Sequence, residues 1–86
     1  WTDIYALGAS MRTCIEGRPP PTAIERHASD TLVPALEAFG RRYPRFLLEA
    51  IDMAMEIDPQ KRPQSAAILS SILAEGSIKS SRKAAQ

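Results

Sequence analysis

Apolar residues recur along much of the chain three and four positions apart, which is the spacing of one face of an α-helix. The first stripe of this kind consists of Ile4, Leu7, Gly8, Met11, Cys14 and Ile15. Thr2 is suited to cap this helix and Gly17 to end it, since the prolines that follow cannot continue a helix. Tyr5, Ala6 and Ala9 are apolar or nearly so but lie off the stripe, so we expect this helix to be buried on more than one side.

Four further helices are predicted after the first one. Their expected ranges are about 22–28, 34–39, 44–56 and 65–75. Gly40 should close the second of these four, Asp58-Pro59 should break the third, and Gly76 should end the last. No segment shows the sustained alternation of apolar and polar residues that marks a strand. The predicted fold class is therefore all-α, with four or five helices and no strands.

The end of the chain differs in composition from the rest. Residues 77–86 consist of Ser, Lys, Arg, Ala and Gln with a single Ile78. Such a composition cannot bury enough apolar surface to order itself. Because 86 residues are enough for one small domain only, we expect one folded unit over residues 1–75 and a flexible polar tail or linker over residues 76–86.

Charge and composition exclude several classes of protein. A net charge of +1 gives no broad attraction to nucleic acid. The cluster of Arg41, Arg42 and Arg45 beside two aromatic residues is not followed by a second basic stripe, so we expect no nucleic-acid binding. No apolar run approaches the length of a membrane-spanning helix. The chain starts at Trp1 in mid-pattern, without Met or a signal peptide, and we expect it to be a piece of a longer protein.

Residue types that carry chemistry are scarce and scattered. There is no Gly-rich phosphate loop and no nucleophile elbow. His27 lies beside Ser29 and Asp30 in a predicted loop, but a catalytic triad needs three groups that converge from different elements, so we expect His27 to be a solvated surface residue. Cys14, the single cysteine, cannot form an internal disulfide, fits a reducing, cytoplasmic location and is expected to be a small buried apolar residue. One Cys and one His do not make a metal site.

Three acidic residues crowd the end of one predicted helix, namely Asp52, Glu56 and Asp58. A carboxylate pair for acid–base catalysis needs a cleft and two different environments, which nothing in this segment indicates. We expect a solvated helix face together with an aspartate that forms a turn.

Three motifs resemble the C-terminal part of a protein-kinase C-lobe. The run from Trp1 to Gly8 resembles helix F of that family, with Asp3, Tyr5, Leu7 and Gly8 at the family's spacing. Gly17-Arg18-Pro19-Pro20 is similar to the turn that follows helix F, and Asp58-Pro59-Gln60-Lys61-Arg62-Pro63 is similar to the stretch before the last helix. Together they cover residues 1–75 and resemble bacterial-type serine/threonine kinases, from helix F to helix I.

The resemblance implies roles for individual residues. Asp3 would accept hydrogen bonds from backbone amides of the catalytic loop, and Arg62 would pair with the Glu of the Ala-Pro-Glu motif. Tyr5 and Gly8 would pack helix F, which should be the central element of the fold. Pro21 stands where the family usually has Phe. Arg12 occupies a position that is often Tyr, and we expect it to snorkel to the surface.

The resemblance also implies what this chain lacks. The Gly-rich loop, the β3 Lys, the helix-C Glu, the His-Arg-Asp loop and Asp-Phe-Gly, which position ATP and Mg²⁺ in kinases, are all missing from the sequence. We therefore expect this chain to be inactive and to bind neither ATP nor Mg²⁺. The full-length parent would use both to phosphorylate Ser or Thr in protein substrates, and it could be membrane-anchored elsewhere. The partners of the chain would be the remainder of the kinase domain, and an exposed helix F would promote self-association.

Two alternatives stay open at this point. The chain could be a complete small helical module for protein–protein interaction, in which case the first helix should have one apolar and one polar face. A helix-turn-helix DNA binder is disfavoured by the charge and by the long proline-rich connections.

Overall fold

The structure, a computed structural model, describes the backbone of residues 2–85 and the side chains of residues 4–82. Over this part of the chain the fold is all-helical, and no strand is present. The elements in order are α1 (Thr2–Glu16), α2 (Ala23–Ala28), α3 (Ala35–Phe39), α4 (Arg45–Ala54), the 3₁₀ helix η1 (Pro59–Lys61) and α5 (Ala66–Ala85). This confirms the predicted all-α fold class. None of these helices combines the length and the apolar character that a membrane crossing requires.

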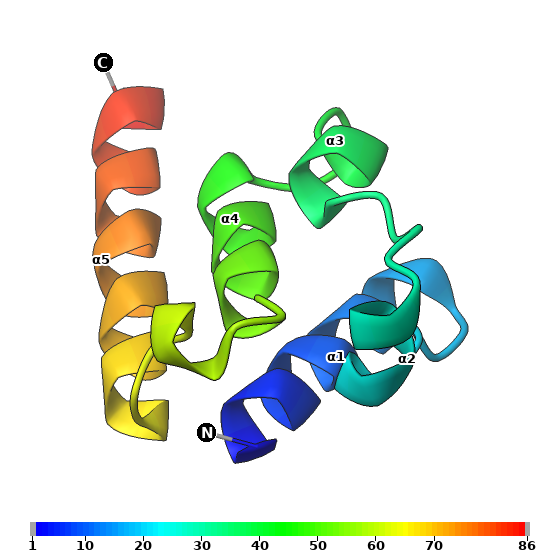
Figure 1. Ribbon diagram of the computed structural model, residues 1–86. Helices are drawn as coiled ribbons and strands as arrows, with labels where there is room; N and C mark the ends of the chain where they lie inside the picture. The colour runs from blue at the N-terminus through cyan, green and yellow to red at the C-terminus, as the bar shows by residue number, and fades with distance from the viewer. Residues whose placement is uncertain (1, 86) are drawn as a thin grey trace.

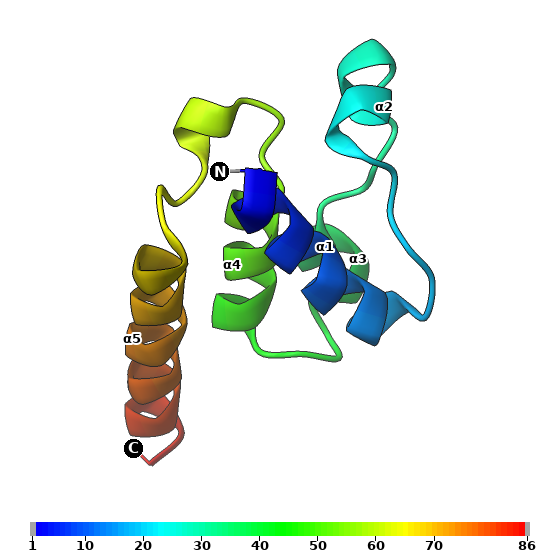
Figure 2. The same cartoon turned by 90° about the horizontal axis from the view of Figure 1, so that it is seen from below.

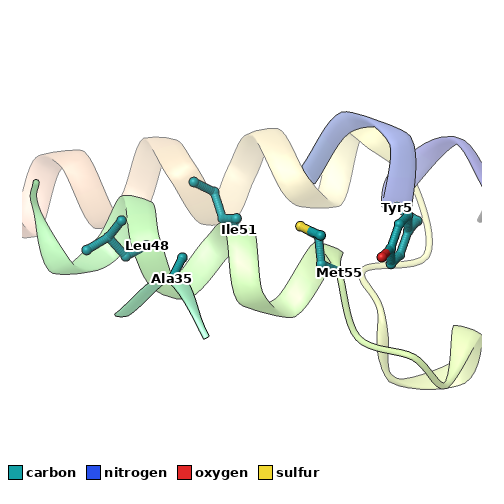
Figure 3. Close-up of a cluster of buried hydrophobic side chains, with 5 residues drawn as sticks. All are labelled: Tyr5, Ala35, Leu48, Ile51 and Met55. Carbon is teal, nitrogen blue, oxygen red and sulfur yellow. The ribbon is translucent and has the colours of Figure 1, made fainter. Parts of the chain in front are cut away.

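Helix α4 lies at the centre of the described fold. It packs against α1 and α3 on one side and against α5 on the other, with α5 antiparallel to it (Figure 1). Two small cores result. One joins α4 to α1 and α3 through Tyr5, Ala35, Leu48, Ile51 and Met55 (Figure 3), and the other joins α4 to α1 and α5 through Ile4, Ala50, Ala54 and Leu69. Helix α1 contributes Tyr5 and Ile4 to the two cores, but the extensive contacts with α1, α3 and α5 are all made by α4. The central element of this chain is therefore α4 and not, as predicted, the first helix.

The buried face of α1 is rotated from the predicted stripe. Ile4, Gly8 and Arg12, which are four residues apart, are buried, whereas Leu7 keeps 42 % of its surface exposed and Cys14 is exposed as well. The prediction of a buried Cys14 is therefore wrong. Leu7 and Cys14 are seven residues apart and share one helix face, and no described element covers that face.

The ends of most helices follow local chemistry. Gly17 ends α1 with a left-handed φ of 85°, as expected of a glycine after a helix. Thr22 caps α2 by accepting the N–H of Glu25 at 3.2 Å. Thr2 already belongs to α1 instead of preceding it, and α4 ends at Ala54, two residues before the predicted end.

The last helix is longer than predicted. Gly76 does not end it, and α5 continues to Ala85, so the expectation of an unstructured tail after Gly76 is wrong for residues 77–85. A Cβ at Gly76 would lie 2.6 Å from the Cβ of Phe46. Gly76 thus allows α5 to approach α4 closely, a use of glycine that resembles a C-cap when only the sequence is read.

Candidate functional site

Arg62 is a buried charged side chain that backbone carbonyls hold in place. Asp58 caps η1 by accepting the N–H of Gln60 at 3.0 Å, and this fixes the turn that delivers Arg62. Its side chain is only 6 % exposed. Nε donates to the carbonyl of Glu56 at 2.6 Å, and Nη2 donates to the carbonyl of Ile57 at 3.1 Å. A buried charge is tolerated when hydrogen bonds replace its hydration in this way.

Tyr5 connects Arg62 to the proline-rich loop that follows α1. The Arg62 guanidinium lies over the Tyr5 ring, 5.0 Å from its centroid, in a cation–π contact. The Tyr5 hydroxyl donates to the carbonyl of Pro21 at 2.9 Å. The Tyr5 side chain therefore contacts Arg62 of the segment 58–63 and the backbone of Pro21, which directly follows the segment 17–20, although these residues are far apart in the sequence.

Gly8 sets the distance between α1 and α4. A Cβ at this position would lie 2.8 Å from the Cβ of Ala54 and 2.9 Å from the Cγ of Met55. These separations are shorter than any van der Waals contact, so α1 can lie this close to α4 only with glycine here. This close packing holds the N-terminal half of α1, with Tyr5, against α4 and Met55 (Figure 3).

An open groove of about 710 Å³ lies beside Tyr5 and Arg62. Its lining is mostly apolar and includes Pro21, Ile24 and Ile57. Ile24 on α2 is 84 % exposed, an unusual state for a large aliphatic side chain. His27 also borders the groove and is exposed, and its imidazole forms no hydrogen bond with the described residues.

Asp3 can be located only by its backbone. It lies in the first turn of α1, and its side chain falls outside the described residues. The structure thus brings Tyr5 and Arg62 together and leaves the contacts of the Asp3 carboxylate undetermined. Among residues 4–82 no group of three or more His, Cys, Asp or Glu side chains is arranged to hold a metal ion, and the expected absence of metal and cofactor stays a prediction.

Arg12 is buried, and the expectation that it snorkels to the surface is wrong. The side chain is held inside because Nε donates to Glu16 at 3.1 Å and the guanidinium lies 5.6 Å from the centroid of the Phe39 ring. Arg18 donates to the other carboxylate oxygen of Glu16 at 3.3 Å. The bond from Arg12, opposed in part by burial and aided by Arg18, lowers the pKa of Glu16 below its ordinary 4.5.

Asp52 has a structural role that the sequence did not reveal. Its two carboxylate oxygens accept the backbone N–H groups of Ala35 at 2.6 Å and Leu36 at 3.0 Å. These groups open α3, whose N-cap residue Pro34 offers no side-chain acceptor. The expectation of a merely solvated Asp52 is therefore wrong. The short loop over residues 40–44 lets α4 run back along α3, so that Asp52 near the end of α4 lies beside the start of α3. Asp58, by contrast, forms the predicted turn.

Arg26 anchors α2, which has no buried residue of its own. Arg26 donates to the carbonyl of Met55 at the end of α4 and to Asp30 at 3.0 Å. Partial burial is the largest single influence and lowers the pKa of Arg26, but the interactions of Arg26 with Asp30 and Tyr5 together outweigh it, and the pKa is raised. The hydrogen bond from Arg26 lowers the pKa of the exposed Asp30 carboxyl.

The comparisons with known proteins give one clear likeness. No family model matches the chain, and no curated protein matches it significantly. Among solved structures, the apo form of PpkA-294, a bacterial serine/threonine kinase, is 40 % identical to the chain and superimposes with a TM-score of 0.78. The match covers 85 % of this chain and 26 % of that one. The chain is therefore similar, over most of its length, to about a quarter of a bacterial serine/threonine kinase.

Proposed function

We propose that the chain is the C-terminal helical part of the C-lobe of a serine/threonine protein kinase, running from helix F to helix I. The observation that carries the proposal is the likeness to the bacterial kinase structure, at 40 % identity over 85 % of the chain. In this assignment α1 is helix F and α5 is helix I. The phosphorylation of Ser or Thr in proteins belongs to the full-length parent.

The convergence of the motif segments supports this assignment independently of overall similarity. Tyr5 is joined to Pro21 by a hydrogen bond and to Arg62 by a cation–π contact. Tyr5 and Arg62 belong to two of the motif segments, and Pro21 directly follows the third. Their meeting at one place is expected if they belong to one kinase substructure and is not required of three unrelated turns.

The groove beside Tyr5 has a natural occupant in this proposal. It would receive the end of the activation segment, and the Glu of the Ala-Pro-Glu motif would approach Arg62 as an additional partner. A guanidinium held by backbone carbonyls presents its charge in a fixed direction, which suits recognition of a carboxylate. Asp3 would accept backbone amides of the catalytic loop from the first turn of α1.

The exposed face of α1 argues against a complete interaction module. Such a module should turn a polar face of its first helix to water, but Leu7 and Cys14 are exposed there together with Ala6. Exposed apolar patches commonly mark a surface that a partner covers. In our proposal the partner is the remainder of the kinase domain.

Catalysis would depend entirely on that remainder. The residues that position ATP and Mg²⁺ in kinases are not in this sequence, so the 86-residue chain would scaffold the catalytic loop and contribute a substrate-facing surface around residues 22–40. Because the parent consumes ATP, we propose a cytoplasmic location for this part of it.

The proposal is tested by the residues encoded upstream and by the activity of the longer protein. We expect a His-Arg-Asp loop and an Ala-Pro-Glu motif in the roughly 200 residues before Trp1, in keeping with the size of a two-lobed kinase domain. The longer protein should transfer ³²P from ATP to Ser or Thr of casein. The 86-residue chain should transfer none and should show no thermal shift with Mg-ATP.

Arg62→Lys in the longer protein tests the proposed link to the activation segment. Lysine keeps the charge but loses the forked geometry, so we expect phosphate transfer to fall by at least about tenfold, the equivalent of 1.4 kcal/mol. Arg41→Lys, an exposed arginine away from the groove, is the matched control and should be neutral. An upstream sequence without the two motifs would refute the family assignment, whereas intact motifs without phosphate transfer would refute only the activity.

A further inference from the structure

Cationic residues of two segments that are far apart in the sequence lie at one end of the molecule. They belong to the turn after α3 with the start of α4, and to the last part of α5, and are Arg41, Arg42, Arg45, Lys79 and Arg82. Because α5 runs antiparallel to α4, its C-terminal part lies at the end where α4 begins (Figure 1), and Arg45 and Lys79 line the same cavity. The sequence shows no second basic stripe directly after Arg45, and only the fold provides one.

These two segments carry a large share of the positive charge of the chain. Residues 41–49 and 75–83 contain six of the eleven Lys and Arg residues but two of the ten Asp and Glu residues. Their net charge is therefore +4, and the rest of the chain has a net charge of −3. The overall charge of +1 is thus the sum of two opposite regions, and the molecule has one strongly positive end.

Most of these cations have no ionic partner within residues 4–82. Four of them are exposed and form no ion pair with a described carboxylate, namely Arg41, Arg42, Lys79 and Arg82. Arg45 pairs with Glu49 at 2.6 Å, but 78 % of the Arg45 side chain is exposed, and such surface pairs are weak. The positive charge of this end is therefore available to an anionic partner.

Each of the two segments also exposes an apolar or aromatic side chain beside its cations. Tyr43 follows Arg42 and is 37 % exposed, and Ile78 precedes Lys79 and is 52 % exposed. Tyrosine is enriched where a bilayer meets water, and an isoleucine gains free energy when it leaves water for an apolar layer. The phosphate backbone of a nucleic acid offers no such layer to Ile78, so the combination favours a lipid surface.

We propose that this end of the molecule docks on the surface of a bilayer that contains anionic lipids. The exposed cations contact the headgroups, and Tyr43 and Ile78 enter the interfacial layer. Each Lys or Arg near such a surface strengthens binding about fivefold, so a net charge of +4 strengthens it on the order of 500-fold over a neutral bilayer. The docking does not depend on the kinase proposal, and neither segment borders the groove beside Tyr5.

Co-sedimentation of the 86-residue chain with lipid vesicles tests the docking. One set of vesicles is pure phosphatidylcholine, and the other contains about 40 % phosphatidylglycerol, which makes its surface anionic. We expect binding to the anionic vesicles to be at least about a hundredfold tighter, and to be lost when the salt concentration rises from about 0.1 to 1 M, because the charges are then screened. Equal binding to both sets would overturn the proposal. Binding to a DNA duplex at the same salt concentration, without binding to the anionic vesicles, would also overturn it and reassign this end to nucleic acid.

Double variants locate the contact on the molecule. Each removes two exposed cations from one of the two segments, and the pair consists of Arg41→Gln with Arg42→Gln and of Lys79→Gln with Arg82→Gln. Both should weaken binding to the anionic vesicles about 25-fold, with folding checked by circular dichroism. Arg18→Gln with Lys61→Gln, which makes the same charge change at exposed residues outside the two segments, is the control and should weaken binding less than about threefold. Equal losses in all three variants would show that net charge alone governs binding and that this end is not the site.

Ile78→Ser separates contact with lipid from attraction by charge. The substitution removes an exposed apolar side chain and leaves every charge in place, so binding to the anionic vesicles should weaken about fivefold. Its dependence on salt concentration should stay the same. Unchanged binding of this variant would overturn the proposed entry of Ile78 into the interfacial layer.

Discussion

Two glycines in this chain have roles that depend on the helix that faces them. Gly8 and Gly76 both lie inside helices, where glycine costs about 1 kcal/mol relative to alanine. At each position a Cβ atom would clash with a neighbouring helix. At Gly8 it would meet Ala54 and Met55, and at Gly76 it would meet Phe46. At the residue scale, therefore, the absence of a side chain fixes how closely α1 and α5 approach α4.

The contact at Gly8 can be tested with Gly8→Val. The new side chain would overlap Ala54 and Met55, so we expect the free energy of unfolding to fall by about 1–3 kcal/mol, the usual cost of overpacking. Urea unfolding followed by circular dichroism measures this loss. Ser10→Val, on an exposed position of the same helix, is the matched control and should change stability little. Equal effects of the two variants would show that propensity and not packing governs the result.

At the scale of elements, α3 depends on a residue from another helix. It has five residues, too few to be stable in isolation. Its first two N–H groups are satisfied by Asp52, and Ala35 is fully buried against α4. Helix α2 is held in a similar way by Arg26, which reaches the end of α4. Helix α3 is thus stabilised by a side chain of α4, whereas α2 is held by its own Arg26, which reaches the backbone at the end of α4.

Asp52→Ala tests this dependence. The variant leaves two N–H groups at the start of α3 without acceptors, and we expect a loss of about 1–3 kcal/mol in the free energy of unfolding. Hydrogen exchange at the amides of Ala35 and Leu36 should accelerate more than exchange in α5. Glu49→Ala removes an exposed carboxylate from the same helix, where it pairs with Arg45 at the surface, and should cost less than about 0.5 kcal/mol. Uniform acceleration across all helices would contradict a local capping role.

At the scale of the whole molecule, the helices leave a face of α1 uncovered. Figure 2 shows α5 and α4 side by side, with α1 crossing near α4 and α2 projecting away from the others. Leu7 and Cys14 lie on the face of α1 that no described helix covers. A chain of this size buries only about 60 % of the surface that its unfolded form exposes, so an uncovered apolar face is a substantial part of its apolar surface.

We expect the isolated chain to self-associate through this face. Sedimentation velocity from about 10 to 200 μM should show a sedimentation coefficient that rises with concentration, because apolar patches of this kind drive association. Leu7→Ser should shift the rise to higher concentration. Ile78→Ser, at a large exposed residue on α5, is the control and should leave it unchanged. A single monomeric species over the whole range, with one sharp melting transition, would contradict the expectation.

The sequence by itself determined the helical fold class, the end of α1 at Gly17, the capped start of α2 at Thr22 and the turn at Asp58. These features depend on φ/ψ preferences and hydrogen bonds within a few residues, which local sequence encodes. It also singled out Tyr5, Gly8 and Arg62. Only the tertiary structure decided which face of α1 is buried, that Arg12 points inward, that Asp52 caps α3 and that Gly76 continues a helix. Each of these depends on which helix packs against the residue. The periodicity of apolar residues predicts how wide the buried face of a helix is, but not which other helix packs against that face.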